Sequence, residues 1–165
     1  MSTNPLHTKF RIFPLLVSVA ITFGIGFVAS LFTRPEITGW YAALKKPAFT
    51  PPNWLFPVAW TTLYLLIAIA AYLVWQRRDS TSTYKTTIVI YVTQLALNFS
   101  WSIVFFGMHR ILAALFIIVA LLVSIVLNIG WFARFSKTAA WLLVPYLMWV
   151  LFAALLNISI SVLNK

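Results

Sequence analysis

Cysteine is absent from the 165-residue chain, and acidic residues are almost absent. Without cysteine, the protein can form neither disulfides nor thiolate metal sites. The two acids are Glu36 and Asp79, and both fall between apolar stretches rather than within them. Proton-coupled and ion-coupled carriers usually keep ionisable side chains at membrane depth. The lack of intramembrane carboxylates therefore argues against coupled active transport.

Charge of either sign is scarce, because charged residues make up 8% of the chain, against roughly 25% in a soluble domain. Hydrophobic residues make up 62%, and the mean hydropathy is +0.96. This much apolar surface requires lipid as the solvent for most of the chain. The net charge of +10 comes from Lys and Arg at or between the apolar stretches, where lipid head groups attract them. We therefore expect the lipid bilayer as a partner, and no nucleic acid.

Hydropathy predicts five apolar segments of 21 to 24 residues: 12–32, 54–75, 86–106, 111–133 and 139–162. At about 1.5 Å per residue, a helix of this length covers the roughly 30 Å hydrocarbon core. Backbone polar groups must be satisfied internally in lipid, which also favours helices. We therefore expect an all-α fold, with residues 1–165 forming one integral membrane bundle of five transmembrane helices.

The links between these segments differ in length. Residues 76–85, 107–110 and 134–138 are short links, which predicts antiparallel neighbours in a compact bundle. Residues 33–53 form a much longer link, and long loops are usually functional or disordered. Its prolines and aromatic side chains argue against disorder.

The orientation is signalled by the distribution of basic residues. Seven Lys and Arg, including Lys9 and Arg11, lie on the side of the N terminus, and five lie on the other side. The positive-inside rule then predicts an N terminus inside and residues 33–53 outside. The first apolar run exceeds the roughly 7–15-residue core of a signal peptide, so we expect a retained helix. No stretch resembles a mitochondrial presequence, which favours a bacterial cell-envelope membrane over the mitochondrial outer membrane.

Tryptophan is the most informative residue type in the chain. Trp60, Trp101 and Trp149 fall inside the second, third and fifth segments. An indole at this depth still needs a partner for its N–H, so each is expected to face a polar group or a cavity. An interfacial belt accounts for the tryptophans at segment ends, which are Trp54, Trp75, Trp131 and Trp141.

The three deep tryptophans each share a helix face with polar, aromatic or small residues three or four positions away. These stripes are Trp60 with Tyr64, then Asn98 with Trp101 and Ser102, then Trp149 with Ala153 and Asn157. Two interpretations stay open. The stripes could pack helices together through asparagine hydrogen bonds and small residues, or they could line a ligand cavity.

Small residues four apart mark further packing faces, and catalytic signatures are few. Gly26 with Ser30, and Ala96 with Ser100, could join helices within the chain or between subunits, which makes a homodimer one interpretation. The known zinc-protease, nucleophile-elbow and phosphate-loop motifs are absent, and we expect no metal site. His7 and His109 fall near the interfaces, so the sequence gives little support for axial haem ligation.

The long link contains "WYAALKKPAFTPPNW", in which Pro47, Pro51 and Pro52 hold the backbone extended or turned. This stretch resembles the W-Y-x-x-L-x-K-P-x-W-x-P-P signature of the translocator protein family. That family is also known as the tryptophan-rich sensory proteins or peripheral-type benzodiazepine receptors. "QLALNFSWSIVFFGMHR" (94–110) and "AAWLLVPYLMWVLFAALLNISI" (139–160) resemble its third and fifth helices. Three motifs in the right order make the resemblance specific.

The resemblance implies a five-helix bundle whose cavity is capped by residues 33–53 as a lid. Family members bind porphyrins and, in animals, cholesterol and drug-like hydrophobic molecules. Protoporphyrin IX or haem is then the expected ligand, with no cofactor required. By motif position, the implied ligand-binding residues are Tyr41, Pro47, Trp60, Tyr64, Asn98, Trp101, Ser102, Trp149 and Ala153. The porphyrin propionates need cations, for which the lid offers Arg34, Lys45 and Lys46.

The chain also departs from the family pattern. Many members carry an acid early in the fourth helix, where this chain offers Ile117, so no role for that carboxylate can be carried over. The sterol motif of animal members is not matched at the end of the fifth segment, which ends "ISISVLNK". Phe49 replaces the usual lid tryptophan and keeps an aromatic ring. Cholesterol is therefore not the first expected ligand.

Three functions are compatible with these features. The leading hypothesis is a membrane receptor or sensor for tetrapyrroles, because a flat aromatic macrocycle can stack on Trp60 or Trp149. An alternative is an enzyme that degrades porphyrin in light and oxygen, with those two tryptophans as the reactive residues. A further alternative is a passive translocator of porphyrin or lipid-like molecules.

Overall fold

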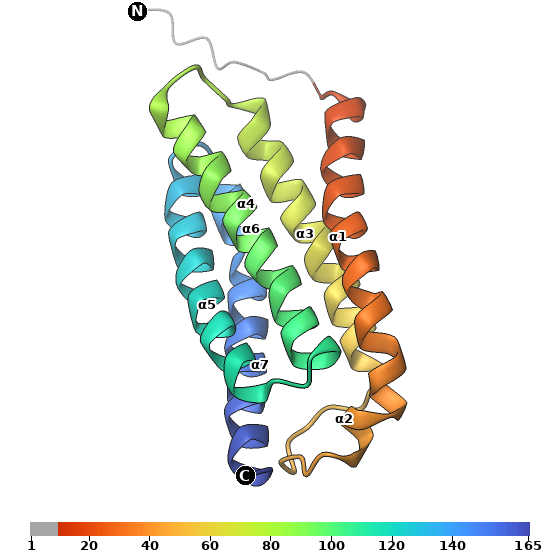
Figure 1. The fold of residues 1–165 in the computed structure, drawn as a ribbon. Coiled ribbons are helices and arrows are strands. Elements are labelled where there is room, and N and C mark those ends of the chain that lie inside the picture. The colour runs from red at the N-terminus through yellow and green to blue at the C-terminus, as the bar shows by residue number, and fades with distance from the viewer. Residues whose placement is uncertain (1–9) are drawn as a thin grey trace, which may run out of the picture.

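The computed structural model describes residues 10–165, and Figure 1 shows them as a bundle of antiparallel helices. Within that range, five helical segments are long and apolar enough to cross a membrane: Ile12–Thr38, Leu55–Gln76, Ser82–Gly107, Ile111–Ala133 and Lys137–Leu163. The predicted all-α membrane fold is confirmed, and the protein is a multi-pass membrane protein. Lys9 and His7 lie outside the described residues.

The elements follow one another along the chain in a simple up-and-down order. They are α1 (Ile12–Thr38), α2 (Trp40–Ala43), α3 (Leu55–Gln76), α4 (Ser82–Ser102), the π-helical turn η1 (Ile103–Gly107), α5 (Ile111–Ala133), α6 (Lys137–Leu142) and α7 (Val144–Leu163). In Figure 1 the start of α1 lies at the top, whereas α2, the α4–α5 turn and the C terminus lie at the bottom. We call the lower end the lid end.

The first helix is longer than hydropathy predicts. Residues 33–53 were predicted to form a loop, but α1 continues through Pro35 to Thr38. Hydropathy marks where a helix leaves lipid rather than where it ends, so the polar residues 33–38 were misassigned. The lid is therefore residues 39–54, with the short helix α2 at its start.

The third and fifth transmembrane segments also differ from the predicted spans 86–106 and 139–162. The third starts at Ser82 and ends in η1, where the hydrogen bonding widens to a π-helical turn next to the α4–α5 link. The fifth is two helices, because α6 ends at Leu142 and α7 begins at Val144 with Pro145 in its first turn. Proline lacks the N–H that a continuous helix would need there.

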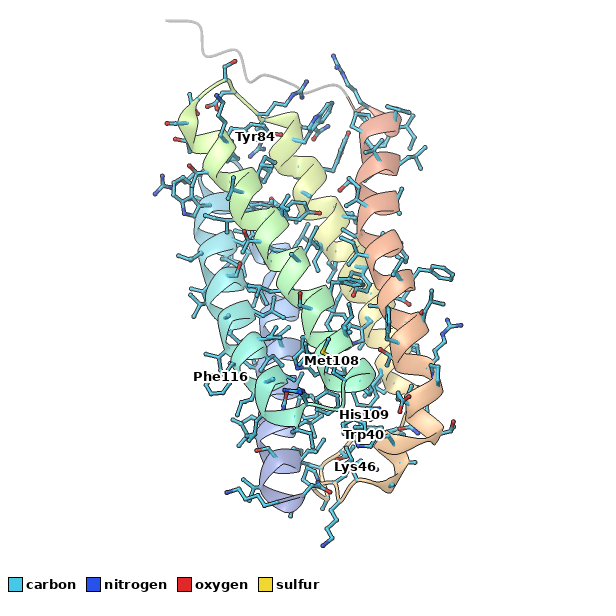
Figure 2. All side chains as sticks on the ribbon, viewed as in Figure 1. Trp40, Lys46, Tyr84, Met108, His109 and Phe116 are labelled. Atoms are coloured by element: carbon cyan, nitrogen blue, oxygen red, sulfur yellow. The ribbon has the colours of Figure 1, made fainter. Side chains whose placement is uncertain are left out.

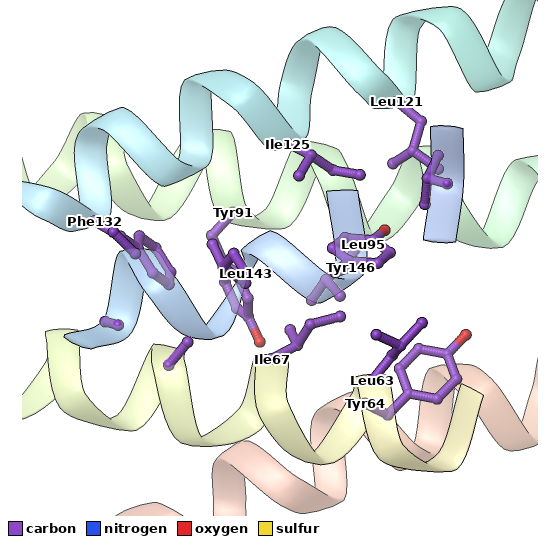
Figure 3. Close-up of a cluster of buried hydrophobic side chains, with 14 of the residues drawn as sticks. Leu63, Tyr64, Ile67, Tyr91, Leu95, Leu121, Ile125, Phe132, Leu143 and Tyr146 are labelled. Carbon is purple, nitrogen blue, oxygen red and sulfur yellow. The ribbon is translucent and has the colours of Figure 1, made fainter. Parts of the chain in front are cut away.

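A buried apolar core fills the half of the bundle away from the lid. It joins α3, α4, α5, α6 and α7 through side chains that include Ile67, Leu95, Ile125, Leu143 and Tyr146, several of which Figure 3 shows. The rings of Tyr91 and Phe132 pack 5.9 Å apart across the α4–α5 interface. This core fixes the positions of the helices that open out toward the lid end.

The fold leaves room for a cavity because the helices separate on the lid side of this core. α3 packs closely on α6 but touches α7 at few places, whereas α1 packs along α3. The backbone break between α6 and α7 lets these two helices take different neighbours. The space that opens between α1, α3, α4, η1 and α7 is the candidate site.

Candidate functional site

A cavity of about 560 Å³ lies between α1, α3, α4, η1 and α7, with the lid at one end. This volume falls within the roughly 300–1,000 Å³ of typical small-molecule sites. Ten aromatic side chains line it, contributed by α1, the lid, α3, α4, η1 and α7: Phe23, Phe27, Tyr41, Phe56, Trp60, Tyr64, Trp101, Phe105, Phe106 and Trp149. Such a lining suits a large, flat and mostly apolar molecule.

The inner wall is held in place by a hydrogen-bonded relay between three helices. The Tyr64 hydroxyl donates to Asn98 Oδ1 at 3.0 Å, and Asn98 Nδ2 donates to the Tyr146 hydroxyl at 3.1 Å. Tyr64 lines the cavity, whereas Asn98 lies behind it and is 3% exposed. Asn98 therefore orients the tyrosine and does not itself face the cavity.

A second relay fixes Trp101. Its indole Nε1 donates to Asn157 Oδ1 at 3.1 Å, and Asn157 Nδ2 donates to the backbone oxygen of Ile111 at 3.0 Å. The Trp101 ring also stacks on Phe105, with centroids 5.2 Å apart. Trp101 and Asn157 both line the cavity, so this wall joins α4, α5 and α7 into one unit.

Trp60 and Trp149 differ from Trp101 because neither indole N–H has a hydrogen-bond acceptor within residues 10–165. Trp60 stacks on Tyr64 with centroids 5.4 Å apart, and Trp149 packs edge-on against Phe56 at 6.0 Å. Both side chains line the cavity. Their donors are therefore free to meet an acceptor on a bound molecule.

The structure brings most of the remaining site candidates to this cavity and leaves three of them outside it. Ser102, Ala153 and Tyr41 line the cavity. Pro47 does not, and its backbone oxygen instead accepts hydrogen bonds from Thr50, closing a turn in the lid. Lys45 and Lys46, two of the propionate-pairing candidates, are also absent from the lining.

The ammonium of Lys46 and the backbone of Lys45 are engaged elsewhere. Lys46 Nζ donates to the backbone oxygens of Tyr41, Ala42 and Leu44 at 2.7 to 3.1 Å. The backbone N–H and oxygen of Lys45 both pair with the side-chain amide of Asn164. Figure 2 shows Lys46 at the lid end below Trp40.

Arg34 is the charged residue that lines the cavity among residues 10–165. It lies near the end of α1, it is exposed, and it forms no ion pair in that part of the chain. The sequence analysis grouped Arg34 with the lid lysines. The longer α1 places it on the helix wall at the mouth of the cavity, where its charge is free to meet an anionic ligand group.

The aromatic ring of His109 lies outside the cavity and braces the lid. It stacks on Trp40 with centroids 4.3 Å apart, and its Nε2 lies 3.0 Å from Glu36 Oε2 (Figure 2). Trp40 also packs against Phe105, and burial raises the pKa of the neighbouring Tyr41 phenol. His109 is thus a structural contact between α1, α2 and the α4–α5 turn, and it does not face a ligand as an axial haem residue would.

α1 provides a share of the cavity wall that the sequence did not predict. Eight lining residues come from this helix, among them Gly26, Ser30 and Thr33. A methyl group on Gly26 would overlap the ring of Tyr64, so glycine is what allows α1 to approach α3 here. The Gly26–Ser30 pair was a signal, but it was interpreted only as a helix-packing face.

Comparison with known proteins agrees with this architecture. Residues 18–163 match the TspO/MBR family. The tryptophan-rich protein TspO of Archaeoglobus fulgidus is 47% identical over 155 residues, covering 93% of this chain and 99% of that protein. The TspO of Chlorobaculum tepidum is 41% identical over 154 residues, covering 93% and 98%. The human translocator protein is 38% identical over 135 residues, covering 79% and 78%. With five membrane-spanning helices and a family match over most of its length, the chain belongs to the TspO/MBR family.

Proposed function

We propose that the protein is a membrane receptor for tetrapyrroles, with protoporphyrin IX or haem as the representative ligand, bound in the aromatic cavity. The observation that carries this proposal is the combination of ten aromatic side chains with Arg34, the one cationic side chain among residues 10–165 that lines the cavity. A porphyrin has this same division, because its macrocycle is flat and aromatic and its propionates are anionic.

The lining of the cavity supports this proposal, because it offers a partner for each part of such a ligand. The macrocycle stacks on Trp60 or Trp149, at roughly 0.5–1.5 kcal/mol per favourable ring pair beyond area burial. A propionate pairs with Arg34, since Lys46 Nζ already donates to three backbone oxygens. The free indole N–H groups of Trp60 and Trp149 are further donors for polar atoms of the ligand. Drug-like hydrophobic molecules fit the same description when they are flat and aromatic.

A titration in nanodiscs tests this proposal. The purified protein is titrated with protoporphyrin IX in the dark while tryptophan fluorescence is followed, beside Trp149→Phe and the control Trp141→Phe. Trp141 is 72% exposed and does not line the cavity. We expect the quenching of wild-type tryptophan fluorescence to be saturable. It should weaken in Trp149→Phe, with helicity and melting unchanged, and it should keep its midpoint in Trp141→Phe. Quenching that never saturates, or that ignores Trp149→Phe, would mean that porphyrin dissolves in lipid.

Light-dependent porphyrin degradation is a second candidate function, favoured by the position of Trp60 and Trp149 on the cavity walls. A bound photosensitiser would excite oxygen next to these indoles. The test compares the bleaching rates of wild type and Trp149→Phe at matched occupancy, with and without a scavenger of the reactive oxygen that free photosensitiser releases. A tryptophan dependence that survives the scavenger supports an enzyme, whereas its loss indicates side chemistry of the ligand.

Passive passage of porphyrin or lipid-like molecules is the remaining alternative. Phe27 of α1 lines the cavity and is 62% exposed, so the α1 wall of the cavity reaches the outer surface of the bundle. We also propose a bacterial cell envelope as the membrane, which the archaeal and bacterial relatives support. A homodimer and an inward-facing N terminus stay predictions.

A further inference from the structure

The side chain of Asn164 pairs with the main chain of Lys45 across the lid end of the bundle. The Lys45 N–H donates to Asn164 Oδ1 at 3.0 Å, and Asn164 Nδ2 donates to the Lys45 oxygen at 2.9 Å. Asn164 follows the last residue of α7, and its Nδ2 also donates to the oxygen of Ile160 at 2.8 Å. One side chain thus satisfies both backbone groups of a lid residue, as the partner strand does in an antiparallel pair.

Lys46, the next residue of the lid, connects the Asn164–Lys45 pair to Tyr41, which lines the cavity. Lys46 Nζ donates to the oxygens of Tyr41, Ala42 and Leu44, and it lies 4.8 Å from the centroid of the Tyr41 ring. An ammonium has three donors, so all of them have an acceptor here. These oxygens belong to the end of α2, where helices leave carbonyl groups without a partner. The Lys46 ammonium therefore caps the C-terminal end of α2.

Tyr41 is the inner end of this chain of contacts. Its side chain is 6% exposed, lines the cavity and packs with Phe105 and Ile160. Ile160 is also the residue whose oxygen Asn164 holds. A continuous set of contacts therefore links the end of α7, through Lys45 and Lys46, to the aromatic wall that closes the cavity.

We divide the lid at Lys45 into a first half, residues 39–44, and a second half, residues 45–54, and the two are attached differently. The first half is held by Trp40, which stacks on His109 and packs against Phe105. The second half is held by the exposed Asn164 hydrogen bonds and by Phe49, which is 53% exposed and packs on Phe152. Exposed neutral hydrogen bonds open more readily than buried aromatic packing, because water replaces their partners when they open. The second half is therefore the part that opens first.

We propose that Asn164 is a positioning residue that clasps the second half of the lid, keeps Tyr41 seated in the cavity wall, and sets the rate at which ligands enter and leave. The clasp itself is a property of the ligand-free protein, and the effect on ligand rates rests on the function proposed above. This is a role for the end of α7 that the family match does not assign.

Hydrogen exchange in the ligand-free protein tests the clasp. Wild type, Asn164→Ala and the control Ser161→Ala are compared in nanodiscs, following backbone amides of residues 39–54. Ser161 lies one turn earlier and forms no hydrogen bond to the lid. We expect lid exchange to be roughly tenfold faster in Asn164→Ala, the factor that corresponds to about 1.4 kcal/mol. Melting and helicity should be unchanged. Equal lid exchange in all three proteins would overturn the clasp.

A second variant, in which Lys46 is replaced, separates the Asn164–Lys45 pair from the hydrogen bonds of Lys46 to the end of α2. Lys46→Met removes the ammonium but leaves the Lys45 backbone free to pair with Asn164. We expect the Lys45 amide to stay protected while the amides of α2 exchange faster. Loss of protection at Lys45 as well would mean that Lys46, and not Asn164, holds the lid, and would overturn the proposal.

Stopped-flow mixing with protoporphyrin IX tests the effect on ligand rates. If Asn164 controls a gate, the association and dissociation rates in Asn164→Ala both rise several-fold, so that the dissociation constant changes little. A weaker affinity with an unchanged association rate would contradict gating. If neither wild type nor variant binds porphyrin, the proposed function fails, whereas faster lid exchange would still support the clasp and equal exchange would still overturn it.

Discussion

The indole N–H of Trp101 donates to Asn157 Oδ1 across 3.1 Å and so ties α4 to α7 at the wall of the cavity. Asn157 Nδ2 in turn donates to the backbone oxygen of Ile111, the first residue of α5. The side-chain amide of Asn157 therefore accepts from the indole and donates to a carbonyl. The aromatic wall is therefore fixed by hydrogen bonds before any ligand arrives.

Replacing Asn157 with Ala should destabilise the protein by roughly 1–3 kcal/mol, because it leaves the indole N–H of Trp101 without its acceptor. Thermal melting in nanodiscs measures the change. Ser161→Ala, on the same helix, should melt like wild type. An Asn157→Ala variant that keeps the wild-type melting temperature would show that the relay does not hold this wall.

Gly26→Ala should move Tyr64, because the added methyl overlaps the tyrosine ring. We expect a loss of roughly 1–3 kcal/mol in stability, typical of overpacking, together with weaker porphyrin binding. Gly24→Ala is the matched control, since no atom lies within 4 Å of the added methyl there. If both variants bind and melt alike, α1 has room to retreat and the close approach of α1 to α3 is not needed.

Replacing the two buried side-chain amides of α4, Gln94 and Asn98, should change the melting temperature in opposite directions. Gln94 is 0% exposed, and neither amide atom has a hydrogen-bond partner within residues 10–165, whereas Asn98 bonds to two tyrosines. Gln94→Met removes an unsatisfied buried group and should raise the melting temperature. Asn98→Leu should lower it, because Tyr64 and Tyr146 lose their partner. A drop in melting temperature for Gln94→Met would reveal a partner for Gln94, such as an internal water.

Arg34→Gln should weaken binding of protoporphyrin IX but not of its neutral dimethyl ester. Because Arg34 is exposed, the charge pair is worth at most about 1 kcal/mol, or roughly fivefold in affinity. Raising the salt concentration should reduce the difference between acid and ester in wild type. Equal losses for both ligands would mean that Arg34 contributes contacts rather than charge.

Several features of the fold follow from the sequence, and others depend on tertiary contacts. Five apolar runs dictate five membrane-spanning helical segments, because lipid satisfies no backbone group. Hydropathy cannot place the end of α1, since residues 33–38 are mostly polar but stay helical. The break before α7 is signalled by Pro145, whereas the π-helical turn η1 has no comparable signal in residue type.

The site likewise has features that the sequence predicts and features that depend on tertiary contacts. Helical spacing already placed Trp60 beside Tyr64 and Trp149 beside Ala153, and these residues meet in the cavity. Spacing along one helix cannot show which side chain of another helix it meets. Spacing therefore could not reveal that Asn98 lies outside the cavity and bonds to Tyr64, or that α1 forms one wall. Nor could it show that the Lys46 ammonium bonds to α2 and does not line the cavity.

The central claim is that the ligand occupies the cavity, and filling the cavity tests this most directly. Ala153 lines it, whereas Leu155 is 58% exposed on the lipid-facing side of the same helix. The account predicts that Ala153→Phe abolishes saturable quenching by protoporphyrin IX with helicity and melting retained, and that Leu155→Phe binds like wild type. Wild-type binding by a folded Ala153→Phe protein would contradict the account, because the porphyrin would then lie somewhere else.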